Sequence, residues 1–179
     1  MQSGLIPHRY AMALYKYAAE TKKTREVYEE MKTFIKSYLA NPGMDKVLSN
    51  PFVKAADKRA VLLAAAGKPG EDFQRFVTLI LDHRREEFAI LMALAYRDIY
   101  RKENHISQVR ITTAAQLPEA EMKKLRSVVE KSFGGVTFEY EYSVDPALIG
   151  GFVIDVDSTR MDASLSGELE QLRQNLSSN

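Results

Sequence analysis

The chain has 179 residues, with 25 Lys and Arg against 24 Asp and Glu, and a net charge of +1. A nucleic-acid-binding protein usually concentrates positive charge, and this chain as a whole does not. It has no cysteine, which excludes disulfides, thiol nucleophiles and cysteine-ligated zinc. The N-terminus shows no signal pattern and the apolar runs are too short to span a bilayer. We therefore expect an intracellular protein that reaches a membrane only through a partner.

The first part of the chain predicts one helix after another. Apolar residues recur at helical spacing, and Pro, Gly and Asn punctuate the segments, including a short piece that ends at Asn50. The apolar stripes are Ala11, Leu14, Tyr15 and Ala18; Val27, Met31, Phe34 and Tyr38; Val61 and Leu62; Phe73, Phe76, Val77 and Ile80; and Phe88, Leu91, Met92, Ala95 and Ile99. Six short helices with brief turns predict a helical bundle over residues 1–105, in which Pro7 suits the first helical position.

The pattern changes near His105. Residues 106–113 alternate apolar and polar side chains, as a strand does, and a helix is predicted from Pro118 to the glycines at 134–135. Residues 136–144 form the clearest strand pattern in the chain, and residues 152–156 a further one. The last helix carries Leu165, Leu169, Leu172 and Leu176. Residues 106–179 thus predict strand, helix, strand, strand, helix, and the fold class is α+β.

The histidines offer no metal-ligand spacing. His8, His83 and His105 lie in three separate elements, so we expect surface or helix-cap positions for all three. We predict no catalytic residue, no metal and no cofactor.

Three features near the C-terminus have structural interpretations. We expect Asp155 and Asp157 on the polar face of a strand, and Asp162 as a cap of the last helix. The glycine pair at 150–151 precedes a strand and lacks the lysine and following helix of a phosphate-binding loop. It indicates a bulge or close backbone packing at the start of that strand.

The first predicted helix has a second apolar stripe. Beside Ala11, Leu14 and Ala18 it carries Tyr10, Ala13, Leu14 and Tyr17, and the fifth helix carries Leu79 outside its core stripe. A surface helix of a bundle needs only one apolar stripe. The spare stripes indicate either a groove for a partner helix or a central helix that the bundle buries on all sides, and the pattern leaves both open.

Four segments together point to one family. They are Arg9 to Leu14 with Ala18; Leu48 to Pro51 with Lys58 and Leu62; Phe73 to Arg85 with Leu91, Ile99 and Tyr100; and Asp145, Leu148, Gly150, Gly151, Asp162 to Ser164, Gly167, Leu169 and Leu172. These segments resemble the delta subunit of F-type ATP synthases, the bacterial counterpart of the mitochondrial oligomycin sensitivity-conferring protein (OSCP). The glycine pair followed by the Asp-x-Ser helix start is the most specific match. The chain departs from the family at Arg84, at or beside a position where glycine is frequent, and in residues 157–160, which lack an expected glycine.

The resemblance implies a non-catalytic stator role. Residues 1–105 would bind the N-terminal helix of an alpha subunit, and residues 106–179 the C-terminal end of the b subunit in the peripheral stalk. The pair of contacts would resist rotor torque during proton-driven ATP synthesis, at the cytoplasmic side of the bacterial inner membrane. The residues expected at the two contacts are Tyr10, Ala13, Leu14, Tyr17 and Leu79 for alpha, and Leu172 and Leu176 for the stalk.

Two other readings stay open at this point. A generic helical scaffold of another complex would differ in the subunits that co-purify with it. An RNA-binding protein would stack bases on Tyr140 and Tyr142. We expect both rings to be buried, because they share a strand face with apolar neighbours, and Glu139 and Glu141 on the other face would repel phosphate.

Overall fold

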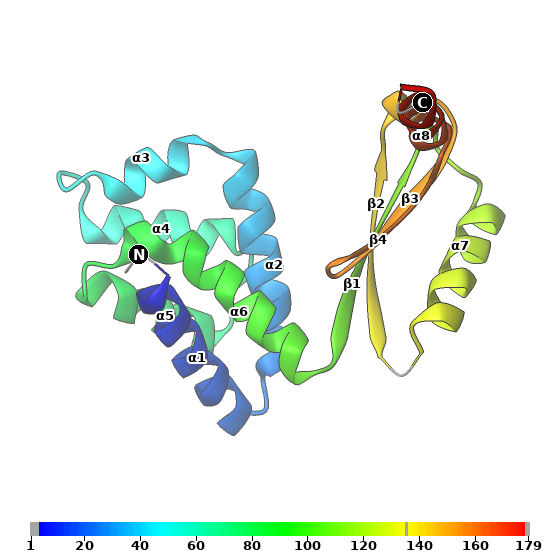
Figure 1. Ribbon diagram of the computed structural model, residues 1–179. Helices are drawn as coiled ribbons and strands as arrows, with labels where there is room; N and C mark the ends of the chain where they lie inside the picture. The colour runs from blue at the N-terminus through cyan, green and yellow to red at the C-terminus, as the bar shows by residue number, and fades with distance from the viewer. Residues whose placement is uncertain (1–3, 135, 178–179) are drawn as a thin grey trace. The chain divides into compact units, whose positions relative to one another are not determined.

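The computed structural model describes residues 4–134 and 136–177. The chain divides into two compact units, residues 1–104 and 105–179 (Figure 1). The first unit consists of α1 (Leu5–Glu20), α2 (Thr24–Ala40), α3 (Gly43–Ser49), α4 (Ala55–Ala65), α5 (Glu71–Asp82), the 3-10 turn η1 (Glu86–Phe88) and α6 (Ala89–Glu103). The second combines helices with a four-stranded mixed sheet, which confirms the α+β class.

The core of the first unit forms where the helical stripes meet. The stripes predicted for α2 and α5 are buried, and α6 packs against both α1 and α2. The largest fully buried side chains are Tyr96, Phe34, Met31, Leu48, Leu62, Ile80 and Met92. Tyr96 also places its hydroxyl within 3.1 Å of the Thr24 carbonyl oxygen, so the one polar atom of this ring has an acceptor inside the core.

Three details of the helical prediction are wrong. Leu91 is 42% exposed, because the buried positions of α6 are instead Ala89, Met92, Ala93, Tyr96, Ile99 and Tyr100. A helix with neighbours on two sides buries a wider stripe than one apolar face predicts. Val61 is only half-buried, and α1 begins at Leu5, two residues before Pro7.

The second unit contains one strand more than the sequence predicted. Its elements are β1 (Ile106–Thr113), α7 (Glu119–Ser132), β2 (Thr137–Val144), the 3-10 turn η2 (Pro146–Leu148), β3 (Gly151–Val156), β4 (Thr159–Ser164) and α8 (Leu165–Ser177). The strand order is β2-β1-β3-β4, with β1 parallel to β2 and the other pairs antiparallel. The predicted strand-helix-strand-strand-helix arrangement is therefore wrong. The missed strand, β4, is a polar edge strand in which only Ser164 is buried, so it lacks the apolar alternation of a strand.

One face of the sheet is apolar and lies under α7. Leu125 and Val129 of α7 join a buried cluster with Val109 and Ile111 of β1 and with Ile154 and Val156 of β3. The opposite face is polar. There the Arg110 guanidinium pairs with Glu141 at 3.2 Å, and the Thr112 and Ser143 hydroxyls lie 2.8 Å apart.

The aromatic residues of β2 are less buried than expected. Tyr140 is half-buried, but Tyr142 is 38% exposed, because β2 is an edge strand and α7 lies over the middle of the sheet. The Arg126 guanidinium lies 5.2 Å from the centre of each ring and donates a hydrogen bond to the Tyr142 hydroxyl. The two rings are therefore engaged by a cation from α7.

Candidate functional site

The spare apolar stripes of α1 and α5 line one groove. Tyr10, Ala13, Leu14 and Tyr17 of α1 and Asp72, Arg75, Phe76 and Leu79 of α5 line a surface hollow of about 390 Å³. Leu14 and Phe76 are buried and form its floor, whereas Ala13 and Leu79 are exposed. We call this hollow the α1/α5 groove. All five residues that the sequence singled out on these two helices lie in it.

The groove is two helical turns long. Tyr10 and Tyr17 are seven residues apart, which corresponds to about 10 Å along α1. Tyr10 lies beside His83 and Tyr17 beside Arg75, so α1 and α5 run in opposite directions along the groove. An apolar groove between two helices, with a small residue at its middle, fits a third helix that presents apolar side chains at every third or fourth position.

Polar contacts fix the side chains at both ends of the groove. The Tyr10 hydroxyl and His83 Nδ1 are 2.7 Å apart at one end. At the other end Arg75 donates to the Tyr17 hydroxyl at 2.6 Å and forms an ion pair with Glu71. Asp72 is buried there and accepts a hydrogen bond of 2.7 Å from the Thr21 hydroxyl, which joins the end of α1 to the start of α5. The two tyrosine rings are thus held in place before any partner binds.

A second apolar surface lies on α8. Leu165, Leu169, Leu172 and Leu176 are all exposed, Leu172 to 57% and Leu176 to 81%. Leu165 lies against Gly150, next to the start of β3, and α8 contacts chiefly β4 and η2. The described residues of α8 from Glu168 onward are exposed. Figure 1 shows α8 at one end of the sheet and α7 along its side. Four exposed leucines at helical spacing are typical of a helix that binds another apolar surface.

The junction between β4 and α8 is a hydrogen-bonded cap. The Ser164 hydroxyl accepts from the Gly167 N–H at 3.1 Å, so Ser164 caps the first turn of α8. Asp162 accepts from the Ser164 hydroxyl at 2.6 Å and from the Ser164 N–H at 3.0 Å, and these bonds hold the pKa of Asp162 below its usual range. The expectation that Asp162 itself caps the helix is wrong. Asp162 instead orients Ser164, which is the capping residue. A Cβ at Gly167 would lie 3.0 Å from the Asp162 carboxylate.

The glycine pair brings β3 close to β4. Gly151 has a φ of +76°, and a Cβ on it would lie 2.1 Å from the carbonyl oxygen of Ala163. No other residue fits that approach, which confirms close backbone packing at the start of the strand. The glycine pair and the Asp-x-Ser motif therefore build one corner, from which α8 leaves the sheet.

Comparison with known proteins agrees with these features. The model of the ATP synthase delta (OSCP) subunit family matches residues 6–176. The chain belongs to this family. It is 38% identical over 177 residues to ATP synthase subunit delta of Phocaeicola vulgatus, covering 97% of this chain and 95% of the relative. It is 36% identical over 180 residues to the subunit of Parabacteroides distasonis, covering 100% and 99% of the two chains.

A solved structure shares the fold of this delta (OSCP) chain. A chain of the Toxoplasma gondii mitochondrial ATP synthase hexamer superposes with a TM-score of 0.71, covering 95% of this chain and 96% of that one, at 19% identity. The family match sets aside the scaffold and RNA-binding readings that the sequence left open.

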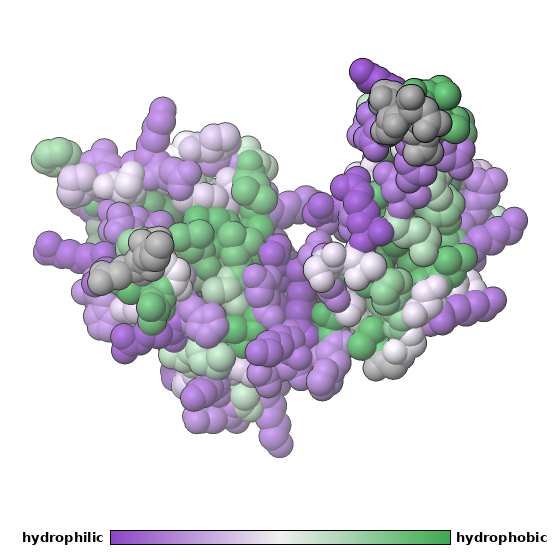
Figure 2. All heavy atoms as spheres, in the orientation of Figure 1, coloured by the Kyte–Doolittle hydropathy of each residue, from purple (hydrophilic) through white to green (hydrophobic). Residues whose placement is uncertain are grey.

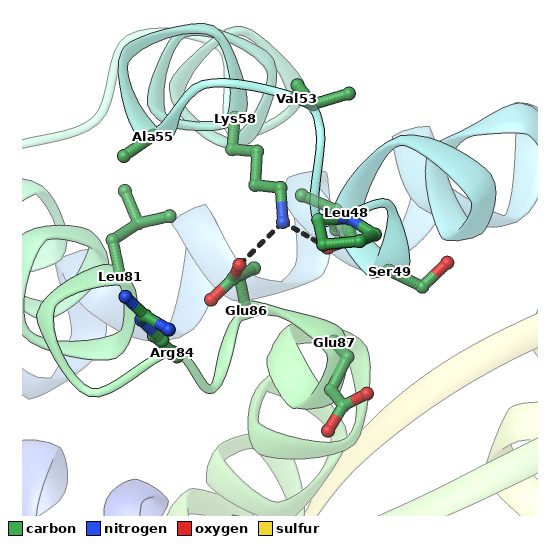
Figure 3. Close-up of a pocket in the computed structure, with 10 residues that line it drawn as sticks. Leu48, Ser49, Val53, Ala55, Lys58, Leu81, Arg84, Glu86 and Glu87 are labelled. Atoms are coloured by element: carbon green, nitrogen blue, oxygen red, sulfur yellow. Dashed lines mark hydrogen bonds and ion pairs between the residues drawn. The ribbon is translucent and has the colours of Figure 1, made fainter.

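The family segment around Lys58 builds a buried ion pair. Lys58 Nζ lies 2.6 Å from Glu86 Oε1 and donates to the Leu48 carbonyl oxygen at 2.7 Å (Figure 3). Glu86 Oε2 is also buried, and no described residue donates to it. The pair ties the end of α3 and the helix α4 to η1, beside a hollow that Arg84 and Ser49 also line. Sequence reasoning missed this pair, because the two residues are 28 positions apart.

The histidines and the acidic residues give no candidate metal site among the described residues. All three histidines are exposed, and His83 caps α5, as expected. Among residues 4–134 and 136–177, no group of three or more His, Asp and Glu side chains could hold a metal ion. No helix in the described parts of the chain is long and apolar enough to cross a membrane.

Proposed function

We propose that this delta (OSCP) chain is the stator subunit of an F-type ATP synthase that joins an alpha subunit to the peripheral stalk. The family is a non-catalytic subunit of ATP synthase, and the curated relatives are delta subunits over nearly their whole length. In this proposal residues 1–105 bind the N-terminal helix of alpha, and residues 106–179 bind the C-terminus of the b subunit. Attachment to the cytoplasmic side of the bacterial inner membrane then comes through the complex.

The observation that carries the alpha contact is the α1/α5 groove. Exposed Ala13 lies between two oriented tyrosines, over a floor formed by Leu14 and Phe76. An alanine at this position lets a partner helix approach closely, and Leu79 supplies an apolar wall that the bundle does not bury. Such a groove gives affinity through apolar anchors and needs no catalytic group.

The stalk contact is supported by the exposed leucines of α8. Leu172 and Leu176 lie farthest from the cap at Ser164 and are 57% and 81% exposed. Because they contribute nothing to the core of the unit, their burial against the stalk would add binding energy without a cost in folding.

The alpha contact is tested by changing each of two alanines of α1 to glutamate in the full chain. Ala13 and Ala19 are both exposed, but only Ala13 lies in the groove. We expect Ala13→Glu to weaken binding of the alpha N-terminal peptide by about 2–4 kcal/mol while the melting temperature is kept, and Ala19→Glu to change neither. If Ala13→Glu binds the peptide normally, the groove is not the alpha site; if it unfolds the protein, position 13 belongs to the core.

A further inference from the structure

The apolar face of the sheet is wider than the helix that covers it. Four strands spaced about 4.8 Å apart span about 14 Å between the outer strand axes, whereas one helix is about 10 Å across. The helix α7 buries Leu125 and Val129 over β1 and β3. On the β2 side, Arg126 extends this cover over Tyr140 and Tyr142. The β4 side has no such cover from the described residues.

An apolar cleft lies on that side, between α7 and β4. It has a volume of about 220 Å³ and is lined by Val128, Val129, Ser132, Phe133, Ile154, Val156, Thr159, Arg160 and Met161. Val128 is 43% exposed and Met161 42% exposed, although both belong to the apolar side of the unit. Figure 2 shows hydrophobic residues at the surface between the strands and α7. We call this hollow the α7/β4 cleft.

The register shows why Met161 faces the cleft. Met161 pairs with Ile154 of β3, which pairs in turn with the buried Ile111 of β1. Paired residues point to the same side of a sheet, so Met161 lies on the α7 side, on the outermost strand. An exposed methionine there extends the core face of the sheet to its edge.

The charges around the cleft are mainly positive. Lys124 and Lys131 stand four positions before and three after Val128, so both lie on the same flank of α7. Arg160 borders the cleft from β4 and pairs with Asp155 at 3.7 Å, so among the described residues the two lysines supply the unpaired positive charge of the rim. Glu121 is the acidic residue of that flank. A partner with acidic side chains beside its apolar residues would complement this rim.

We propose that the α7/β4 cleft receives a second helix, an acidic amphipathic segment of the peripheral stalk that lies alongside α7 and completes the cover of the sheet. This inference rests on the stalk contact proposed above and adds a site distinct from the α8 leucines. The stalk would then hold the C-terminal unit at two apolar surfaces, the free leucines of α8 and the flank of α7.

The absence of native cysteine makes the cleft directly testable. Met161→Cys places a thiol in the cleft, and Thr137→Cys places one at an exposed position on the opposite face of the sheet. We expect the soluble C-terminal portion of the b subunit to slow maleimide modification at position 161 at least tenfold, and to leave position 137 unchanged. Equal modification rates at position 161, with the b portion bound, would overturn the inference.

Charge reversal gives a second, independent readout. We expect Lys124→Glu with Lys131→Glu to weaken binding of the b portion at least tenfold at low salt, and less at high salt, because the attraction is screened. Lys123→Glu is the control, since Lys123 pairs with Glu119 on another side of α7. An equal effect of both changes would contradict a directed contact. If the parent chain binds no b portion, or Leu172→Glu leaves binding intact, the α8 proposal itself is wrong.

Discussion

The Tyr10 hydroxyl lies 2.7 Å from Nδ1 of His83, and this contact joins two residues 73 positions apart at one end of the α1/α5 groove. The two rings also meet edge to face, with centroids 6.0 Å apart. His83 caps the end of α5, so a side chain fixed by that helix sets the position of a ring on α1. The histidine acts as a support for the groove wall.

We therefore predict that Tyr10 and His83 act together in binding the alpha peptide. Tyr10→Phe keeps the ring but removes the hydrogen bond, and we expect it to lower the affinity by about 1 kcal/mol. His83→Phe should cost about the same, and the double variant little more than either single one, because both changes remove one interaction. Peptide titration of the four proteins measures this coupling, and strictly additive losses would mean that the contact does not position the ring.

The ion pair between Lys58 and Glu86 should matter for stability and not for binding. Lys58→Met leaves a carboxylate buried without its partner, so we expect the free energy of unfolding to fall by about 3–5 kcal/mol. Replacing both residues, as Lys58→Met with Glu86→Leu, should recover most of this loss. Urea unfolding of the three proteins checks the prediction. A loss below about 1 kcal/mol in the single variant would show that the pair is effectively solvated.

Arg84 departs from the family pattern at a backbone position that favours glycine. Its φ is +53°, and the side chain is exposed beyond the end of α5. Because a residue with a Cβ is strained there, we expect Arg84→Gly to raise the free energy of unfolding by about 1 kcal/mol. Arg84→Ala removes the same charge and keeps the strain, so it should leave stability unchanged. If both variants are more stable than the parent, the gain comes from removing the Arg84 charge and not from relieving backbone strain.

The cap at the start of α8 predicts a dependence on pH. The bonds from Ser164 lower the pKa of Asp162 in the folded protein, so the ionised carboxylate stabilises the fold. That contribution is present above the ordinary aspartate pKa of about 4 and is lost as the pH falls through the lower folded value. Asp162→Asn keeps an acceptor but not the charge. We expect it to be less stable than the parent at pH 7, with the difference vanishing toward about pH 2. A difference that stays constant would exclude the charge as its cause.

The sequence was most informative for the apolar stripes of α2 and α5 and for the second stripe of α1. The stripes of α2 and α5 and the spare residues of α1 all lie where their spacing placed them, because helical periodicity alone decides which side chains share a face. It was less informative for α6, whose two neighbours bury two faces, and for β4, which is polar and depends on β3 for its pairing.

The other features that the sequence did not predict are contacts between residues far apart in the chain. The Lys58–Glu86 pair, the Tyr10–His83 contact and the Arg126 cover of β2 each join residues from separate elements. No local pattern encodes such pairs. Two departures from the family pattern were nevertheless a usable signal, since both Arg84 and Asp157 adopt positive φ, where glycine is the ordinary choice.

The central claim is that one chain holds two partners at separate surfaces. It is tested most directly by titrating the alpha N-terminal peptide into the full chain, first alone and then saturated with the soluble C-terminal portion of the b subunit. The account predicts a complex with one copy of each component, and the same peptide Kd in both titrations to within about twofold, which is under 0.5 kcal/mol. Displacement of the b portion by the peptide, or failure of either partner to bind, would contradict it.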